Sequence, residues 1–478
     1  MTDSTNPSSP HTRRKRALFL GGAGLAVALG GAAFVLLGGP GRPGSHGHDA
    51  HAHGAEHPSN KAKRYEATQE VLRHSDRAAR AAATGDRAKA REALGEAQKL
   101  APDFPPVLLV QTCLALDESN DAEAGAALAK LGAAAPGSPE VALLEGMRAL
   151  RRVPGTSWQQ AFREAWVSLG RPDLQKSILL PGATPLPPDP ADAEAEKAAW
   201  ERATSDDTKL LLALALRRLD EDKLAFLLKQ VPRLEDPALY LAVVDTFRGV
   251  TLPEPMLAET GKVFRQKLEA LAKAHPDSLQ LQLLLLLGDT EQGTPLSAAE
   301  LDALEKLVAM PSWRGTSFAA TYQQARQRLA EAGVTDPSAM AMAVAMRSIN
   351  DRGTWVLRTR NVGTRGTLDA EGRKRLGRLT RELGTRLAAQ NTLMERMTGL
   401  QLVRGGAQDM GDEVGVKLAV ARMDELEKAL GVFRKTAMVR WPLYGLTEEM
   451  MAANTSDETG YLLSFGADAP ARASGTQP

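Results

Sequence analysis

The sequence contains a single cysteine and few aromatic residues, and each scarcity excludes a class of structure. With Cys113 as the only cysteine among 478 residues, no intramolecular disulfide can form and no multi-cysteine metal site can exist. Aromatic residues make up 4% of the chain, and alanine and leucine dominate the apolar positions, which favours packed helices over sheets. The 59 basic residues balance 58 acidic ones, so overall charge does not attract the chain to nucleic acid.

The motifs of common enzymes are also missing. No glycine-rich turn ends in Gly-Lys-Ser or Gly-Lys-Thr, and no His-Glu-x-x-His helix, Gly-x-Ser-x-Gly turn or Cys-x-x-Cys-His haem site is present. After residue 60 the only histidines are His74 and His275. We therefore expect no enzyme activity, no cofactor and no small-molecule substrate. The alternative is an enzyme with a divergent site in residues 347–466, which would require a concave pocket lined by convergent polar groups.

One stretch of the chain repeats itself after 34 residues. Three residues recur at this step: Ala90 as Ala124, Leu94 as Leu128, and Pro102 as Pro136. Ala90, Leu94 and Ala97 share one face of a helix, and the proline ends that helix. Between the copies lies the apolar run VLLVQTCLAL, in which we expect Cys113 to be a small buried side chain rather than a reactive thiol.

The repeat length and its order of small, bulky, small and proline residues resemble the tetratricopeptide repeat, a family of stacked helical hairpins. The resemblance is good over residues 71–136 and weaker to 172, because the third turn, at residues 153–156, is about two residues longer. It implies an all-α fold with a TPR-like helical-hairpin solenoid over residues 61–180. Such an array presents a groove, made by successive first helices, that binds other proteins.

Further helices are expected beyond a proline-rich linker at residues 181–192. We predict degenerate helical repeats over residues 193–345, with helices at 191–202, 207–219, 222–230, 237–248 and 254–275. The apolar run Leu279–Leu287 is too short to span a membrane and should fill the centre of this array.

Residues 346–466 are expected to form a basic loop followed by a helical hairpin, and residues 467–478 a disordered tail. Between Arg347 and Arg386 there are eleven basic and four acidic residues, with glycines at 353, 363 and 366 predicting the loop. One helix would run from Thr367 to about Arg404. After a turn at Gly405 and Gly406, a second helix would carry an apolar seam: Val416, Ala419, Met423, Leu426, Leu430 and Phe433. The arginines are either a solvated helix face or a contact site for phosphate or carboxylate groups.

The amino-terminal region predicts a membrane anchor. Residues 1–16 end in four basic residues, and residues 17–39 carry no charge over a length sufficient to cross a bilayer. The basic cluster predicts a cytoplasmic tail, so the rest of the chain would lie in the periplasm of a Gram-negative bacterium, with the protein single-pass in the inner membrane. That topology disfavours nucleic acid as a partner. Two alternatives are a cleaved signal resembling a twin-arginine export signal, with a site near Ala50 and Ala52, and a buried helix.

Residues 40–60 form a linker rich in histidine, glycine and proline. Its histidines can bind zinc, copper or nickel, or can simply belong to a polar tether; they are His46, His48, His51, His53 and His57.

The leading hypothesis is an inner-membrane-anchored periplasmic TPR scaffold that mediates protein–protein interactions in an envelope complex for secretion, motility or cell-wall assembly. The alternative is a metal-handling or cytochrome- or cofactor-maturation accessory that uses the histidine-rich linker.

Overall fold

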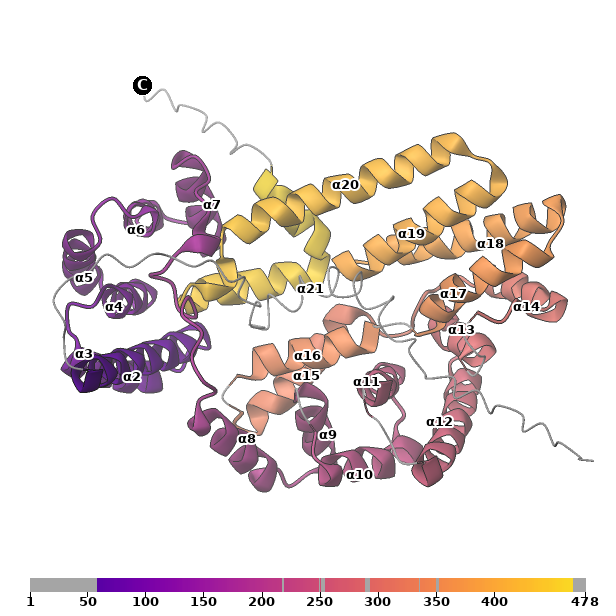
Figure 1. Cartoon of the computed structure of the whole chain (residues 1–478), viewed down its shortest axis with the longest axis horizontal. Helices are drawn as coiled ribbons and strands as arrows, with labels where there is room; N and C mark the ends of the chain where they lie inside the picture. The colour runs from indigo at the N-terminus through magenta and orange to yellow at the C-terminus, as the bar shows by residue number, and fades with distance from the viewer. Residues whose placement is uncertain are drawn as a thin grey trace, which may run out of the picture. The chain divides into compact units, whose positions relative to one another are not determined.

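The computed structural model describes the backbone of residues 58–216, 219–248, 250, 254–288, 293–334, 336–349 and 352–466 (Figure 1). The chain divides into two units, and the first, residues 1–39, lies wholly outside the described residues. The predicted membrane span at residues 17–39 and the five linker histidines therefore also lie outside them. None of the helices that are described is long and apolar enough to cross a bilayer.

The described residues form helices joined by turns, with one isolated parallel bridge between Ser278 and Ser312, so the all-α prediction is confirmed for this part of the chain. In chain order the elements are α2 (Pro58–Ala83), α3 (Arg87–Leu100), α4 (Pro105–Asp117), α5 (Asp121–Ala134), α6 (Pro139–Arg151), α7 (Trp158–Ser168), η1 (Leu174–Lys176), α8 (Pro190–Arg202), α9 (Asp206–Ala215), α10 (Glu221–Gln230), η2 (Val231–Arg233), α11 (Pro237–Arg248), α12 (Glu254–Ala274), α13 (Leu279–Leu287), α14 (Ala298–Val308), α15 (Phe318–Glu331), α16 (Pro337–Ile349), α17 (Arg352–Thr367), α18 (Ala370–Ala388), α19 (Leu393–Met410), α20 (Glu413–Lys435), η3 (Met438–Arg440) and α21 (Tyr444–Gly466).

The 34-residue step of the sequence is reproduced in the turns of the first two hairpins, α2–α3 and α4–α5. The N–H of Asp86 donates to the carbonyl of Ala81, and the N–H of Asn120 donates to the carbonyl of Ala115, 34 residues further on. The side chains of Asp86 and Asn120 then cap the next helix by accepting from the N–H three residues later. The repeat is therefore a repeat of backbone geometry as well as of residue types.

The third hairpin, α6–α7, departs from this spacing as expected. Ser157 caps α7 and lies 37 residues after Asn120 rather than 34, because the connecting turn is longer. Gly146 allows the two helices to approach closely, since a Cβ there would lie 2.9 Å from the Cβ of Ala165.

The predicted repeat positions fill the core of these hairpins. Ala90, Leu94 and Ala97 are at most 2% exposed, and their counterparts on α5 are also buried. Cys113 is fully buried on α4, so the prediction of a small buried side chain is confirmed, and this burial raises the pKa of its thiol well above the usual value. A helix buried around most of its circumference, as α4 is, must be covered on more than one side.

The helices predicted between residues 191 and 275 all form, with small shifts at their ends. The main difference is α9, which ends at Ala215 rather than Leu219, because Leu216 adopts an extended backbone with ψ 144°. The apolar run is buried as α13, whose leucines belong to a core shared with α14, α17 and α18: Leu279, Leu283, Leu287, Leu304, Val356, Leu357 and Leu379.

The predicted loop at the start of the basic region is wrong, because residues 352–367 form the continuous helix α17. Its glycines serve close packing instead of breaking the helix. A Cβ on Gly353 would lie 3.0 Å from the backbone nitrogen of Leu284, and one on Gly363 would lie 2.7 Å from the carbonyl oxygen of Gly293. These positions therefore require glycine because another backbone lies against them.

The predicted hairpin turn at Gly405 and Gly406 is also wrong. The helix expected over residues 367–404 ends at Ala388, and Thr392 caps a new helix, α19, that contains both glycines. The turn into α20 comes at Gly411, whose φ is +72°. The antiparallel pair is thus α18 with α19. Helix α20 packs on α19 and α21, and most of the predicted seam is buried, namely Ala419, Met423, Leu426 and Phe433.

Candidate functional site

The predicted metal ligands are not tested by the structure. His46, His48, His51, His53 and His57 lie outside the described residues. Within the described part of the chain, no group of three or more histidine, cysteine, aspartate or glutamate side chains is arranged to hold a metal ion.

The arginines of the basic region are largely used within the protein. Arg360 is 1% exposed, forms a double hydrogen bond to the carboxylate of Glu300 at 2.7 and 2.8 Å, and also donates to the carbonyls of Thr294 and Pro295. Its hydrogen bond lowers the pKa of Glu300. This guanidinium therefore holds α17 to the start of α14 and is not open to a ligand.

Three further arginines of α18 also have internal partners. Arg375 donates to Asp302 and Glu305 on α14, at 2.7 and 2.6 Å, and Arg378 donates to Glu305 at 2.9 Å. Arg381 reaches Asp412 at 2.9 Å, just before α20. The positive charge that the sequence concentrates between residues 347 and 386 is thus largely balanced by carboxylates of neighbouring helices. This arrangement weakens the hypothesis of a free anion-binding face.

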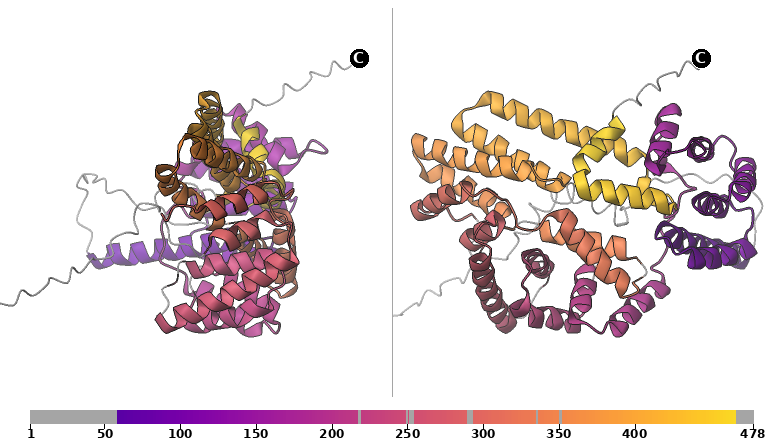
Figure 2. Two further views of the ribbon diagram at one scale, coloured as in Figure 1. Left: turned by 90° about the vertical axis from the view of Figure 1, so that its right-hand side faces the viewer. Right: turned by 180° about the vertical axis from the view of Figure 1, so that it is seen from behind.

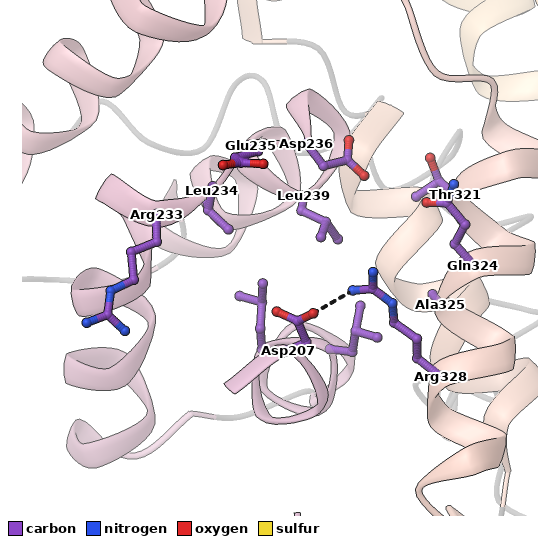
Figure 3. Close-up of a pocket in the computed structure, with 12 residues that line it drawn as sticks. Asp207, Arg233, Leu234, Glu235, Asp236, Leu239, Thr321, Gln324, Ala325 and Arg328 are labelled. Atoms are coloured by element: carbon purple, nitrogen blue, oxygen red, sulfur yellow. Dashed lines mark hydrogen bonds and ion pairs between the residues drawn. The ribbon is translucent and has the colours of Figure 1, made fainter. Parts of the chain in front are cut away.

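A small pocket lies between α9, the start of α11 and α15 (Figure 3). Its volume is about 230 Å³, which is below the usual range of about 300–1,000 Å³ for ligand pockets. Leucines form part of its lining, and Asp207 and Arg328 form an ion pair at 3.0 Å across its mouth. Asp236 is committed to the helix start, where it accepts from the N–H of Ala238 at 2.8 Å. The described lining contains neither histidine nor cysteine.

The most extensive polar recognition in the described structure involves one face of α2. Residues 174–192, which we call the strap, follow the third hairpin and return along the side of α2 and α4 that faces α21 (Figures 1 and 2). Asp76 accepts from the N–H of Gly182 at 3.1 Å. Arg77 then holds Asp189 through three contacts of 2.7 to 3.0 Å, and Arg80 donates to Asp192 at 3.1 Å.

Arg440, in η3, holds the first part of the strap from the other side. Its guanidinium donates to four backbone carbonyls at 2.8 to 3.2 Å; these belong to Gln175, Ser177, Leu180 and Pro181. Leu180 is 1% exposed, so this part is buried. Burial lowers the pKa of Arg440, while the charges of Asp76 on α2 and Glu140 on α6 act in the opposite direction. Arg440 therefore holds the strap through its backbone carbonyls, whereas α2 holds it mainly through its carboxylates.

The start of α21 contacts the turn end of each of the first three hairpins. The ring of Tyr444 lies against Gly85, where φ is +81° and a Cβ would lie 2.9 Å from the ring. The N–H of Gly445 donates to Asp117 at the end of α4, at 3.0 Å. Glu449 accepts from the N–H groups of Trp158 and Gln159 at the start of α7, at 3.0 and 2.7 Å. Three hairpins that are consecutive in sequence are thus joined by one helix more than 280 residues further along the chain.

Sequence reasoning placed a binding surface on the first helices but missed that the chain itself occupies part of it. The signals available were the alternation of prolines and aspartates in residues 181–192 and the basic residues Arg77 and Arg80 on α2. Neither signal indicates that the two segments meet.

Compared with known proteins, the chain matches no family model, no curated sequence and no solved structure. The resemblance to the tetratricopeptide repeat therefore rests on the residues and on the repeated turn geometry described above.

Proposed function

We propose that this protein is a scaffold whose TPR-like hairpins bind extended segments of partner proteins, and that it works from an inner-membrane anchor in a periplasmic envelope complex. The observation that carries the proposal is the occupied face of α2. There the carboxylate of Asp76 and the guanidinium groups of Arg77 and Arg80 hold a later segment, the strap, by one backbone N–H, that of Gly182, and by two acidic side chains at the start of α8.

The helical architecture supports a binding role for a second reason. Each hairpin buries its apolar face on its neighbours, so side chains on the remaining faces can vary without loss of the fold. An anchor at residues 17–39 would hold these surfaces near the membrane, where a high effective concentration favours weak partners. Secretion, motility and cell-wall assembly complexes are the expected hosts.

Cross-linking in intact cells tests the proposal. The full chain carrying a carboxy-terminal affinity tag is cross-linked before membranes are solubilised, and recovered peptides are identified by mass spectrometry, with an unrelated tagged membrane protein as the control. We expect one envelope complex to be enriched, with cross-links that map to residues 58–192. Recovery of the same proteins as in the control would contradict a scaffold role.

A reporter fusion tests the location separately. Alkaline phosphatase fused after residue 478 should be active, because it folds only outside the cytoplasm, whereas a green fluorescent protein fusion should stay dark. A fluorescent fusion with an inactive phosphatase would place the hairpins in the cytoplasm and overturn the periplasmic part of the proposal.

A further inference from the structure

The strap consists of two parts that are held in different ways. Residues 174–181 are anchored by the four carbonyl contacts of Arg440 and by the buried side chains of Leu174 and Leu180. Residues 182–192, which we call the clasp, run into the first turn of α8, which Asp189 caps, and contact α2 through Gly182 at one end and through Asp189 and Asp192 at the other. The clasp can therefore leave α2 without disturbing the buried anchor.

The middle of the clasp contributes little to its own attachment. Pro185, Pro187 and Pro188 have no N–H to donate, and all three are exposed. Proline-rich sequence of this kind stays extended in the absence of any partner, so little conformational entropy is lost when it binds or gained when it leaves. The span from Gly182 to Asp189 therefore behaves as a stiff spacer between two attachment points.

The attachment points on α2 are partly open to solvent. The side chains of Arg77 and Arg80 are 41% and 54% exposed and that of Asp192 is 52% exposed, whereas that of Asp189 is only 10% exposed. The Arg80–Asp192 pair is therefore weak, because water and salt screen it, and the Arg77–Asp189 pair is the stronger of the two. Their occupancy depends mainly on the clasp being tethered beside α2, which gives it a high effective concentration. A competing segment with better contacts can displace it.

We propose that the clasp is a built-in competitor, and that the α2 face it covers binds an acidic segment of a partner protein that leads into a helix, as the clasp leads into α8. The partner segment would donate a backbone N–H to Asp76 and, seven and ten residues later, place carboxylates on Arg77 and Arg80, as Gly182, Asp189 and Asp192 do. This inference rests on the proposed scaffold function and names the chemistry of the partner at that face.

The probe is a fluorescein-labelled peptide with the sequence of residues 180–194, and its binding to the purified full chain is measured by fluorescence anisotropy. The variant Asp189→Asn/Asp192→Asn weakens the clasp, while asparagine keeps the size and the helix-capping oxygen at residue 189. We expect this variant to bind the peptide at least about tenfold more tightly than the unmodified chain, since two partly exposed ion pairs no longer compete. Adding Arg77→Gln/Arg80→Gln should abolish the gain.

Two controls test whether the gain in binding depends on the aspartates of the peptide or on a general weakening of the clasp. Glu194→Gln/Glu196→Gln removes the same charge from exposed positions of the neighbouring helix α8 and should bind like the unmodified chain. A peptide with asparagine in place of both aspartates should bind the weakened variant at least tenfold less tightly than the acidic peptide. Equal binding of the two peptides, or no gain in the Asp189→Asn/Asp192→Asn variant, would overturn the proposal.

Sedimentation of the same variants tests whether the occupant is instead a second copy of this chain. We expect the Asp189→Asn/Asp192→Asn variant to sediment like the unmodified chain. A concentration-dependent dimer that excess peptide dissociates would show that the α2 face binds the strap of a second copy of this chain. That result would reject a partner segment as the occupant. If the peptide does not bind but the cross-linking result holds, the scaffold proposal stands and only the peptide site on α2 is rejected. If the peptide binds but cross-linking enriches no complex, the scaffold proposal is rejected and the peptide site remains.

Discussion

Glu448 and Glu449 are adjacent on α21 and bind two different parts of the chain, α15 and α7. Glu448 accepts from Arg326 on α15 at 2.5 Å, whereas Glu449 accepts the two N–H groups that begin α7. Successive side chains on a helix diverge by about 100°, so the two carboxylates necessarily point to different neighbours. The first turns of α21 thus connect the repeated hairpins with the later helices.

The first prediction concerns the carboxylate that caps α7 from a distance. Glu449→Ala leaves the N–H groups of Trp158 and Gln159 without their acceptor and removes a negative charge from a helix amino terminus. We expect the free energy of unfolding of the full chain to fall by about 1–3 kcal/mol. Urea unfolding followed by circular dichroism measures the change.

Glu427→Ala is the matched control for this substitution, because Glu427 is an exposed glutamate on α20. It should alter the free energy of unfolding by no more than about 0.5 kcal/mol. Hydrogen exchange adds a local readout, since α7 and the start of α21 should lose protection together in Glu449→Ala. A drop in stability with unchanged exchange in α7 would argue against the capping role.

The second prediction concerns the close packing of α18 on α19. A Cβ on Gly377 would lie 2.7 Å from the carbonyl oxygen of Gly406, and one on Gly384 would lie 2.7 Å from that of Gly399. Gly377→Ala should therefore force the helices apart and lower the free energy of unfolding by about 1–3 kcal/mol, despite the better helix propensity of alanine.

Gly431→Ala on α20 should have the opposite effect on stability to Gly377→Ala, because a Cβ at residue 431 would meet nothing within 4 Å. With no clash, the gain in helix propensity should raise the free energy of unfolding by about 0.5–1 kcal/mol. Thermal unfolding of the two variants should shift in opposite directions. Shifts of the same sign would show that contact between the helix backbones does not determine these positions.

The glycines also show how far the sequence could predict this fold. The hairpins at residues 58–134 were predictable because the determinants are local: buried small residues one turn apart, a capping Asp86 or Asn120, and a proline that ends each unit. Glycine has two uses, in turns with positive φ and in close helix packing. Gly85 and Gly411 have positive φ in turns, whereas Gly406 lies in a helix that packs closely on another. Only the element that lies opposite a glycine determines which of these uses applies.

The candidate site was predictable only in part for a similar reason. The first helices could be chosen as a binding surface from the repeat alone. The pairing of Arg77 with Asp189 joins residues 112 positions apart, and that of Gly445 with Asp117 joins residues 328 positions apart. Local periodicity carries no information on such pairs. The excess of arginine between residues 347 and 386 was misleading because its balancing carboxylates, such as Glu300, lie on other helices.

The third prediction contrasts a buried with an exposed arginine that both pair with α14. Arg360→Met removes the buried partner charge of Glu300 and leaves two backbone carbonyls without their guanidinium donor, so the free energy of unfolding should fall by about 3–5 kcal/mol. Arg378→Met removes an ion pair whose side chains are 54% and 44% exposed, and should cost no more than about 1 kcal/mol. Urea unfolding of both variants measures the difference. Equal losses would contradict the structural role of Arg360.

The last prediction is a dependence of stability on pH that comes from Glu458. Burial raises the pKa of this carboxyl group to about 7, although it accepts a hydrogen bond from the N–H of Leu393 at 2.7 Å. Because the folded-state pKa lies above the unfolded value of 4.5, the folded chain keeps a proton between these pH values that the unfolded chain has lost. Stability should therefore fall as the pH rises from about 5 to 8, by up to about 3 kcal/mol from this one group. Glu458→Gln resembles the protonated form and keeps an acceptor for Leu393, so its advantage over the unmodified chain should grow across the same interval. Urea unfolding at pH 5, 6, 7 and 8 measures both profiles, and a constant difference between them would show that Glu458 titrates in its ordinary range.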